Sequence, residues 1–349
     1  MKSRKKVAIG LSAGVDSSVS AYLLKKKGWD VTGITLKICP EQSRCQGSNS
    51  LEQISAFCCK LNIPYHIIDV ENLFKEKIIN YFINSYLRGV TPNPCAYCNR
   101  LIKFGFLLEK VRFLGIDYLA TGHYSRIAKI KESLLLRKGK DKKKSQEYFL
   151  SLIEPSALSS LIFPLGNYTK EKVKKIAKEK KIIFSDKKES QDVCFIKGES
   201  YSQYIEKNKD NSYDYSGEIK HIKGKILGRH KGFYCYTLGQ RAGLGVSWRE
   251  PLYVVEVDSK TNTVIVAEKE FVYRKSFYVE SLNWFLAPQR FKNIKVQVRY
   301  NSKLYSCDLD IKAKQARVSL KEKVEAIAPG QAAAFYYKDL LLGGGIISR

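Results

Sequence analysis

The sequence lacks any run of the roughly 20 consecutive apolar residues that a membrane-spanning helix needs. Its nine cysteines are odd in number and lack the dense spacing of a secreted disulfide scaffold. Histidine is scarce, and one CxxC pair, Cys95 and Cys98, has no second pair at ligand spacing, which argues against structural zinc. We expect a soluble cytoplasmic protein with no cleaved signal and no membrane partner.

Acidic residues are also few, with 34 against 61 basic ones and a net charge of +27. A field of this sign concentrates polyanions, so nucleic acid is the first partner to test. A lysine-biased genome would produce the same excess without functional meaning. The hydrophobic content of 44% excludes a disordered chain and allows several domains with cores.

The pattern of apolar runs and glycines divides the chain into three parts. Residues 1–205 alternate short β-branched runs with amphipathic stretches, which predicts an α/β fold, a doubly wound parallel sheet with helices on both faces. Glycine-punctuated short runs predict a small β-rich central domain at 206–275, and alternating runs predict a C-terminal β-barrel at 276–349. The expected strands of the first part lie at 7–11, 31–38, 65–70 and 118–121, and its expected helices at 17–27, 51–61, 73–86, 98–113 and 170–180.

Small residues follow the first expected strand, in the order Gly10-Leu-Ser-Ala-Gly-Val-Asp-Ser-Ser18. Backbone amides in such a turn point at an anion, and the dipole of the following helix attracts negative charge. No Gly-Lys-Ser/Thr follows, so this is not a Walker loop. The order resembles the pyrophosphate loop (SGGxDSS) of the ATP-pyrophosphatase superfamily, which adenylates carbonyl oxygens. Ala13 replaces the usual glycine, which costs about 1 kcal/mol if the position requires positive φ.

Two further segments carry cysteines. Two prolines stiffen Thr91-Pro-Asn-Pro-Cys-Ala-Tyr-Cys-Asn99, and Cys98 is expected to open a helix, which would lower its pKa. Cys194 lies in a short apolar run and by itself indicates a core cysteine. The other cysteines match no motif and are interpreted as small buried or incidental residues: Cys39, Cys45, Cys58, Cys59, Cys235 and Cys307.

Six motifs occur in a fixed order: the phosphate loop, TPNPCAYCNRLIKFG (91–105), LATGHY (119–124), SQDVCFI (190–196), GFYCYTLGQRAGLG (232–245) and APGQAAAFY (328–336). Together they resemble bacterial tRNA-specific 2-thiouridylases over nearly the whole chain. The resemblance implies ATP-dependent 2-thiolation of the wobble uridine of tRNAs for Lys, Glu and Gln. It also implies Mg²⁺ with the ATP, and a sulfur donor such as a cysteine desulfurase or a sulfur-relay protein.

The resemblance further assigns roles to residues. Cys98 would be the nucleophile and Cys194 the persulfide carrier. The ATP site would comprise Gly10, Leu11, Ser12, Ala13, Gly14, Val15, Asp16, Ser17, Leu36 and Gly122. The target base would meet Asn93, Pro94 and Cys95, and the rest of the tRNA His123, Lys144, Ser145, Gln146, Arg299, Tyr300 and Gln331. By residue type alone, His123 could cap a strand end, and Arg299 with Tyr300 could be ordinary barrel surface.

Cys95 departs from relatives that carry aspartate at this position. Cys95, Cys98 and Cys194 could together ligate an iron-sulfur cluster. Alternatively, Cys95 is a spare thiol or a disulfide partner for Cys98. Two other functions stay open at this stage: an ATP-pyrophosphatase synthetase acting on a small molecule, and a non-catalytic RNA-binding protein on a decayed enzyme scaffold.

Overall fold

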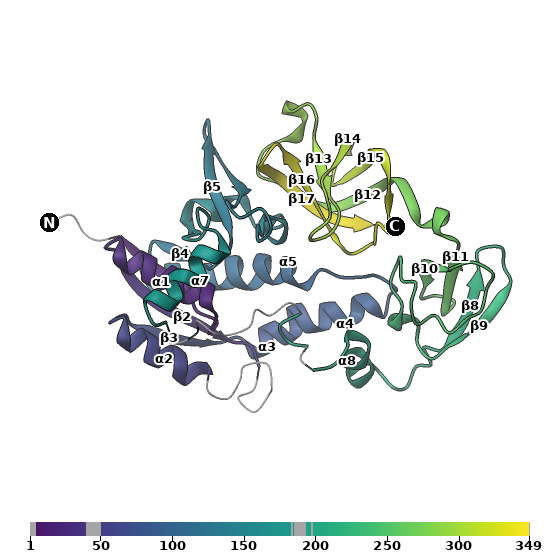
Figure 1. Cartoon of the computed structure of the whole chain (residues 1–349), viewed down its shortest axis with the longest axis horizontal. Coiled ribbons are helices and arrows are strands. Elements are labelled where there is room, and N and C mark those ends of the chain that lie inside the picture. Colours follow the sequence, from purple (N-terminus) through teal and green to yellow (C-terminus); the bar gives the residue numbers. More distant parts are fainter. Residues whose placement is uncertain (1–4, 40–49, 183, 185–192, 197, 349) are drawn as a thin grey trace.

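The computed structural model describes residues 5–39, 50–182, 184, 193–196 and 198–348. Cys45 and the segment 190–192 of the SQDVCFI motif lie outside the described residues. Within the described ranges, no helix is long and apolar enough to cross a bilayer. Figure 1 shows the N-terminal α/β domain at one end, the small central domain at the other, and the barrel above the long helices between them.

A parallel sheet organises the N-terminal domain, as predicted. Its strand order is β3-β2-β1-β4-β7, and every pairing is parallel. Alternate residues of β1 enter opposite cores, since Val7 and Ile9 pack with one apolar cluster and Ala8 with the other. The strands are β1 (Lys6–Gly10), β2 (Asp30–Lys37), β3 (Tyr65–Asp69), β4 (Tyr118–Ala120) and β7 (Leu161–Ile162).

Helices cover both faces of this sheet, which confirms the doubly wound arrangement. One core contains residues of α1, α2 and α7, and the opposite core contains residues of α6 and of the barrel. The helices of the domain are α1 (Val15–Lys26), α2 (Ser50–Lys60), α3 (Glu71–Phe74), α4 (Asn80–Tyr86), α5 (Pro94–Cys98), α6 (Leu107–Phe113) and α7 (Lys170–Glu179), with π-helical segments at Lys75–Ile79 and Asn99–Phe106.

The helix predicted to begin at Cys98 begins earlier, at Pro94. The Asn93 side chain accepts a hydrogen bond from the Ala96 N–H at 3.1 Å, which makes Asn93 the N-cap. Proline suits the first helical position because its missing N–H would have no partner there. The predicted start at Cys98 is therefore wrong by one turn, and Cys98 lies one turn inside a helical stretch that continues into the π-helical segment Asn99–Phe106.

The barrel is closed, in agreement with the prediction. Its strand order is β12-β15-β14-β13-β16-β17, and β12 also pairs with β17. A hairpin of the N-terminal domain extends the same sheet, because Leu136 in β6 pairs with Leu341 in β17. The strands are β5 (Ser125–Ile130), β6 (Ser133–Lys138), β12 (Tyr273–Trp284), β13 (Lys295–Gln297), β14 (Tyr305–Lys312), β15 (Gln315–Glu325), β16 (Ala332–Tyr337) and β17 (Leu340–Ser348).

The central domain is a four-stranded sheet, with strand order β10-β11-β8-β9. A capping box formed by Ser200 and Gln203 starts the helix that precedes it. The elements are α8 (Tyr201–Asn208), β8 (Gly217–His221), β9 (Ile226–His230), β10 (Tyr253–Asp258) and β11 (Thr263–Ala267). Short 3-10 turns across the chain lie at Glu147–Leu150, Pro155–Ser160, Phe233–Cys235, Lys269–Val272 and Pro288–Arg290.

Candidate active site

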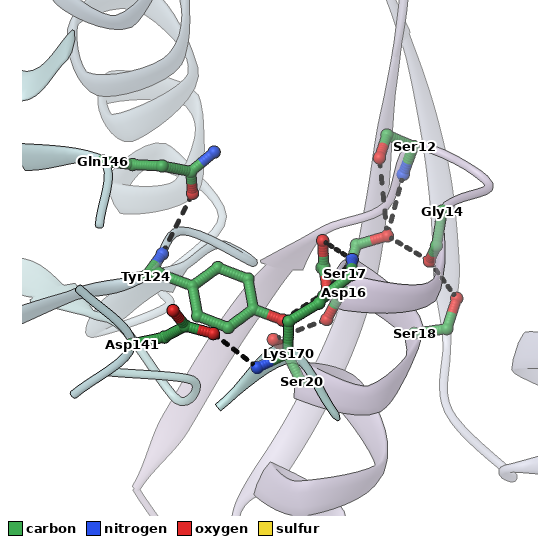
Figure 2. A network of polar contacts seen from close by, with 10 residues as sticks. All are labelled: Ser12, Gly14, Asp16, Ser17, Ser18, Ser20, Tyr124, Asp141, Gln146 and Lys170. Atoms are coloured by element: carbon green, nitrogen blue, oxygen red, sulfur yellow. Dashed lines mark hydrogen bonds and ion pairs between the residues drawn. The ribbon is translucent and has the colours of Figure 1, made fainter. Parts of the chain in front are cut away.

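The phosphate loop joins the carboxyl end of β1 to the N-terminus of α1. Gly14 occupies the N-cap in an extended conformation and has no side chain with which to cap the helix. The hydroxyls of Ser17 and Ser18 instead donate to the Gly14 carbonyl, at 3.1 and 3.0 Å, and the Ser12 N–H donates to Ser17 Oγ at 3.3 Å. Figure 2 shows this tight turn. Its amides lie at a helix N-terminus, which suits phosphate.

Ala13 adopts a left-handed backbone conformation, with φ of 52°, and is buried. This geometry meets the condition under which alanine in place of glycine costs about 1 kcal/mol. The strained backbone of Ala13 therefore lies within the predicted nucleotide loop.

Gly122 lies directly against the phosphate loop. A Cβ atom added there would lie 2.9 Å from the Ser17 N and 3.0 Å from the Asp16 carbonyl carbon. Only glycine permits this approach without displacing the start of α1. The structure therefore brings Gly122 together with the Gly10–Ser17 loop. Leu36 lies on β2, the strand next to β1, beyond the Gly10–Ile34 pair toward the carboxyl end of the sheet, where doubly wound folds bind ligands.

Lys170 and Tyr124 contact Asp16, next to the phosphate loop, and were not predicted as site residues from the sequence. The Lys170 ammonium lies 2.8 and 2.7 Å from the two carboxylate oxygens of Asp16, and the Tyr124 hydroxyl donates to Asp16 Oδ1 at 2.7 Å (Figure 2). The Lys170 side chain is only 10% exposed. The sequence did contain one indication of a role for Lys170. It lies on the same helix face as the apolar residues Val173 and Ala177, where a lysine needs a charged partner.

The predicted tRNA segment Lys144–Gln146 joins this network. Gln146 accepts from the Tyr124 N–H through its side chain at 3.0 Å and donates its own N–H to the Tyr124 carbonyl at 3.1 Å. The Asp141 carboxylate accepts from the N–H groups of Lys144 and Lys170, at 3.3 and 2.9 Å. Ser145 accepts from the Gly139 N–H at 2.7 Å. The structure thus connects the predicted nucleotide loop with part of the predicted tRNA surface.

The cysteines of α5 do not have the electrostatics expected of them. Burial raises the pKa of Cys98, and the nearby Lys103 charge offsets this only in part. The predicted lowering of the Cys98 pKa is therefore wrong, because the desolvation of the buried thiol outweighs the favourable charge of Lys103. Cys95 is exposed at the surface, yet desolvation by the surrounding protein also raises its pKa.

His123 lies in the same neighbourhood. Its Nδ1 is 2.7 Å from Thr121 Oγ1, and its ring packs near those of Phe104 and Phe163. Burial, and then the Lys103 charge, hold the pKa of His123 well below its usual value, so the ring is neutral near pH 7. The charge of Lys103 acts on Cys95, Cys98 and His123 alike, which places these groups around one cation that the sequence did not reveal.

Cys194 is exposed, and the residues after it anchor it to the helices. Phe195 packs edge-on against Phe74 and Phe82, at centroid distances of 5.9 and 5.3 Å. Cys98 packs against the same apolar cluster. Cys95 and Cys98 are free thiols. In the part of the chain that the structure describes, no three His, Cys, Asp or Glu residues are grouped so as to hold a metal ion.

The residues of the barrel that were predicted to contact tRNA differ in their surroundings. The Tyr300 ring is 4.4 Å from that of Phe149, whose carbonyl accepts from the Asn99 side chain at 3.0 Å. Arg299 is exposed and donates to the Glu325 carbonyl at 3.1 Å. Gln331 instead contacts the chain itself, because its side-chain amide donates to the Thr91 and Pro92 carbonyls.

The family profiles agree with this architecture. The profile described as the tRNA methyl transferase HUP domain matches residues 5–198. The tRNA methyl transferase PRC-barrel domain matches 203–268, and the aminomethyltransferase beta-barrel domain matches 274–347. The parallel sheet and its phosphate loop thus define a HUP-domain protein, to which a PRC-barrel and a β-barrel are attached.

Curated relatives narrow the class. The tRNA-specific 2-thiouridylase MnmA of Aquifex aeolicus is 42% identical, over 99% of each chain. That of Persephonella marina is 43% identical, over 98% of this chain and 99% of the relative. The chain therefore belongs to the tRNA-specific 2-thiouridylase family, which confirms the resemblance.

Among solved structures, a 4-thiouridine synthetase–RNA complex with bound ATP is 18% identical. The match covers 55% of this chain and 45% of that chain, with a TM-score of 0.37. A likeness at that level carries no functional weight.

Proposed function

We propose that this protein thiolates the wobble uridine of tRNA at position 2, using ATP and sulfur carried on cysteine. The observation that carries the proposal is the family membership over nearly the full chain, combined with a phosphate loop whose neighbours reach the predicted tRNA segment. The rival functions are not favoured, because a small-molecule synthetase would need neither cysteine segment and a decayed scaffold would not keep both cysteines and Asp16.

The nucleotide half of the reaction would occur at the N-terminus of α1. The uracil O2 is a poor leaving group until ATP adenylates it, with release of pyrophosphate. The loop amides would hold the phosphates, and Gly122 leaves room beside them. Asp16 is the carboxylate at this position, and its side chain is 34% exposed, so it could hold a magnesium ion that neutralises phosphate charge.

The sulfur half would use the two cysteines in turn. The terminal sulfur of a Cys194 persulfide attacks C2 and displaces AMP, and the Cys98 thiolate then attacks the inner sulfur and releases thiolated tRNA. This leaves a Cys98–Cys194 disulfide, so a thiol reductant must restore the enzyme and a persulfide donor must reload Cys194. The exposure of Cys194 suits loading by a cysteine desulfurase or a sulfur-relay protein.

An iron-sulfur cluster on Cys95, Cys98 and Cys194 does not fit the described structure, because these thiols are not grouped as a ligand set. The persulfide relay is therefore the form of the proposal developed above.

The decisive experiment is mass spectrometry of nucleosides from unmodified tRNA incubated with the protein, ATP and a persulfide donor. We expect 2-thiouridine, with AMP released in proportion and only when tRNA is present. Cys98→Ser and Cys194→Ser should abolish the product, whereas the matched control Cys235→Ser should retain it. AMP formation without tRNA would favour a small-molecule synthetase, and an active Cys194→Ser variant would reject the two-cysteine mechanism.

A further inference from the structure

The loop before α5 has few backbone donors of its own. Pro92 and Pro94 lack an N–H, so the carbonyls of Thr91 and Pro92 depend on partners from elsewhere. The side-chain Nε2 of Gln331 donates to both, at 3.2 and 2.9 Å. Because both partners are carbonyl oxygens, the NH₂ end of the amide must face them. One barrel side chain thus satisfies two consecutive carbonyls of the loop.

The backbone around Gln331 docks on the same loop. The Thr91 N–H donates to the Pro329 carbonyl at 3.0 Å. Gly330 has φ of +91°, and a Cβ added there would lie 2.3 Å from Val90 Cγ1 and 2.7 Å from the Thr91 oxygen. This close approach therefore requires glycine. Gly330 is itself fixed on β17, because its N–H donates to the Ile347 carbonyl at 2.8 Å.

A second contact lies beside the residue that caps α5. Asn93 is 5% exposed, and its side chain acts against the rise in pKa that burial imposes on Tyr148, which places the two groups close together. The Tyr148 hydroxyl in turn donates to the Ala332 carbonyl of β16 at 3.0 Å. Since Asn93 Oδ1 caps α5 through the Ala96 N–H, Tyr148 and the barrel strand β16 lie next to the start of the helix that carries Cys95 and Cys98.

We propose that Gln331 is a positioning residue for sulfur transfer, holding the loop Thr91–Asn93, and with it α5, in the register in which the thiols meet the target base. The inference rests on the proposed function but assigns Gln331 a role within the chain, whereas the family resemblance placed it at the tRNA. It also makes the C-terminal barrel part of the reaction site. A shift of α5 by an ångström would misplace the thiols and slow the chemical step.

The test uses Gln331→Met, which keeps the length of the side chain and removes its donors. Gln331→Glu keeps the shape and sets oxygen against both carbonyls, and serves if the first variant is unstable. The control, Gln315→Met, removes an amide that bonds to Glu280 on an exposed part of the same barrel. Amide exchange of residues 91–94 is measured without tRNA, where only Thr91 and Asn93 carry amide protons. The tRNA dissociation constant and the kcat and KM for thiolation follow.

We expect faster exchange at Thr91, a kcat lowered about 10- to 100-fold, and an unchanged tRNA dissociation constant, with the control like the parent. Unchanged exchange and kcat would overturn the proposal. A weaker tRNA affinity with intact kcat would also overturn it and make Gln331 a tRNA contact. If the parent protein fails to thiolate tRNA, the proposed function fails, while the exchange measurement still shows whether Gln331 holds the loop.

Discussion

The Lys170 ammonium contacts both oxygens of the Asp16 carboxylate, at 2.8 and 2.7 Å. This ion pair joins the first residue of α7 to the first turn of α1, next to the phosphate loop. Lys170 is nearly buried while Asp16 is a third exposed. The pair therefore fixes Asp16 beside the predicted nucleotide loop and leaves part of the carboxylate accessible.

Lys170→Met should weaken ATP binding and destabilise the protein. Removing the ammonium leaves a partly buried carboxylate held by the Tyr124 hydroxyl, so Asp16 would no longer be fixed on both oxygens beside the phosphate loop. Because Asp16 is a third exposed, we expect a loss of about 1–3 kcal/mol in unfolding free energy, below the full cost of a buried pair. Thermal unfolding and ATP titration measure both effects. The matched control is Lys178→Met, on the exposed face of α7, and equal behaviour of the two variants would contradict the prediction.

Ala13→Gly should relieve strain in the phosphate loop. The left-handed φ of 52° disfavours alanine by about 1 kcal/mol, although the extra freedom of glycine in the unfolded chain offsets part of the gain. We expect equal or slightly higher stability together with tighter ATP binding. Ala313 is the matched control, since it has φ of 51° in the exposed turn after β14. Ala313→Gly should change stability alone, and an equal gain in ATP affinity there would refute the loop-specific effect.

Local patterns predicted the sheet because strands such as β1 and β2 are short β-branched runs. They did not predict β17, whose Gly343, Gly344 and Gly345 suppress a strand prediction. Those glycines are needed for close packing: a Cβ at Gly343 would lie 2.2 Å from the Asn283 carbonyl oxygen on β12, the strand that closes the barrel. The addition of β6 to β17 is likewise a contact between residues far apart in the chain, and sequence periodicity does not report it.

The candidate site was predicted unevenly for the same reason. Motif order gave the residues of the phosphate loop and both cysteine segments. Lys170 and Lys103 act through partners that only the fold brings near, namely Asp16 for the first and the thiols of α5 for the second. The expected pKa of Cys98 was wrong because its sign depended on burial of the thiol, which the fold determines and the local sequence does not show.

The central domain should lose stability in acid through Glu268. Hydrogen bonds from its own backbone and from Trp248, and then from His221, lower the Glu268 pKa from 4.5 to about 2. Since the folded-state pKa lies below the unfolded value, the stabilisation is present above pH 4.5 and is lost as the pH falls toward 2. Glu268→Gln should lower the unfolding midpoint at pH 7 and flatten its dependence over this range. Circular dichroism melts at several pH values test this, with the exposed Glu250→Gln as control, and parallel curves for the parent and Glu268→Gln would contradict it.

Cys95 provides the test between the persulfide relay and an iron-sulfur cluster. Cys95 and Cys98 lie three residues apart in α5, which places them on one helix face as a pair. A cluster that binds a transferable sulfide needs a third thiolate, and Cys194 does not join the pair into a ligand set in the described structure. We therefore expect anaerobically purified protein to thiolate tRNA with a persulfide donor while free of iron, and Cys95→Ser to retain that activity.

The measurements are iron content, the visible absorption spectrum and nucleoside mass spectrometry, each before and after anaerobic treatment with iron and sulfide. Cys59→Ser, at an exposed thiol of α2, is the matched control for loss of a surface cysteine. If activity instead appears only after iron and sulfide are supplied, and disappears in Cys95→Ser but not in Cys59→Ser, then Cys194 must move to join α5 and the relay is the wrong mechanism.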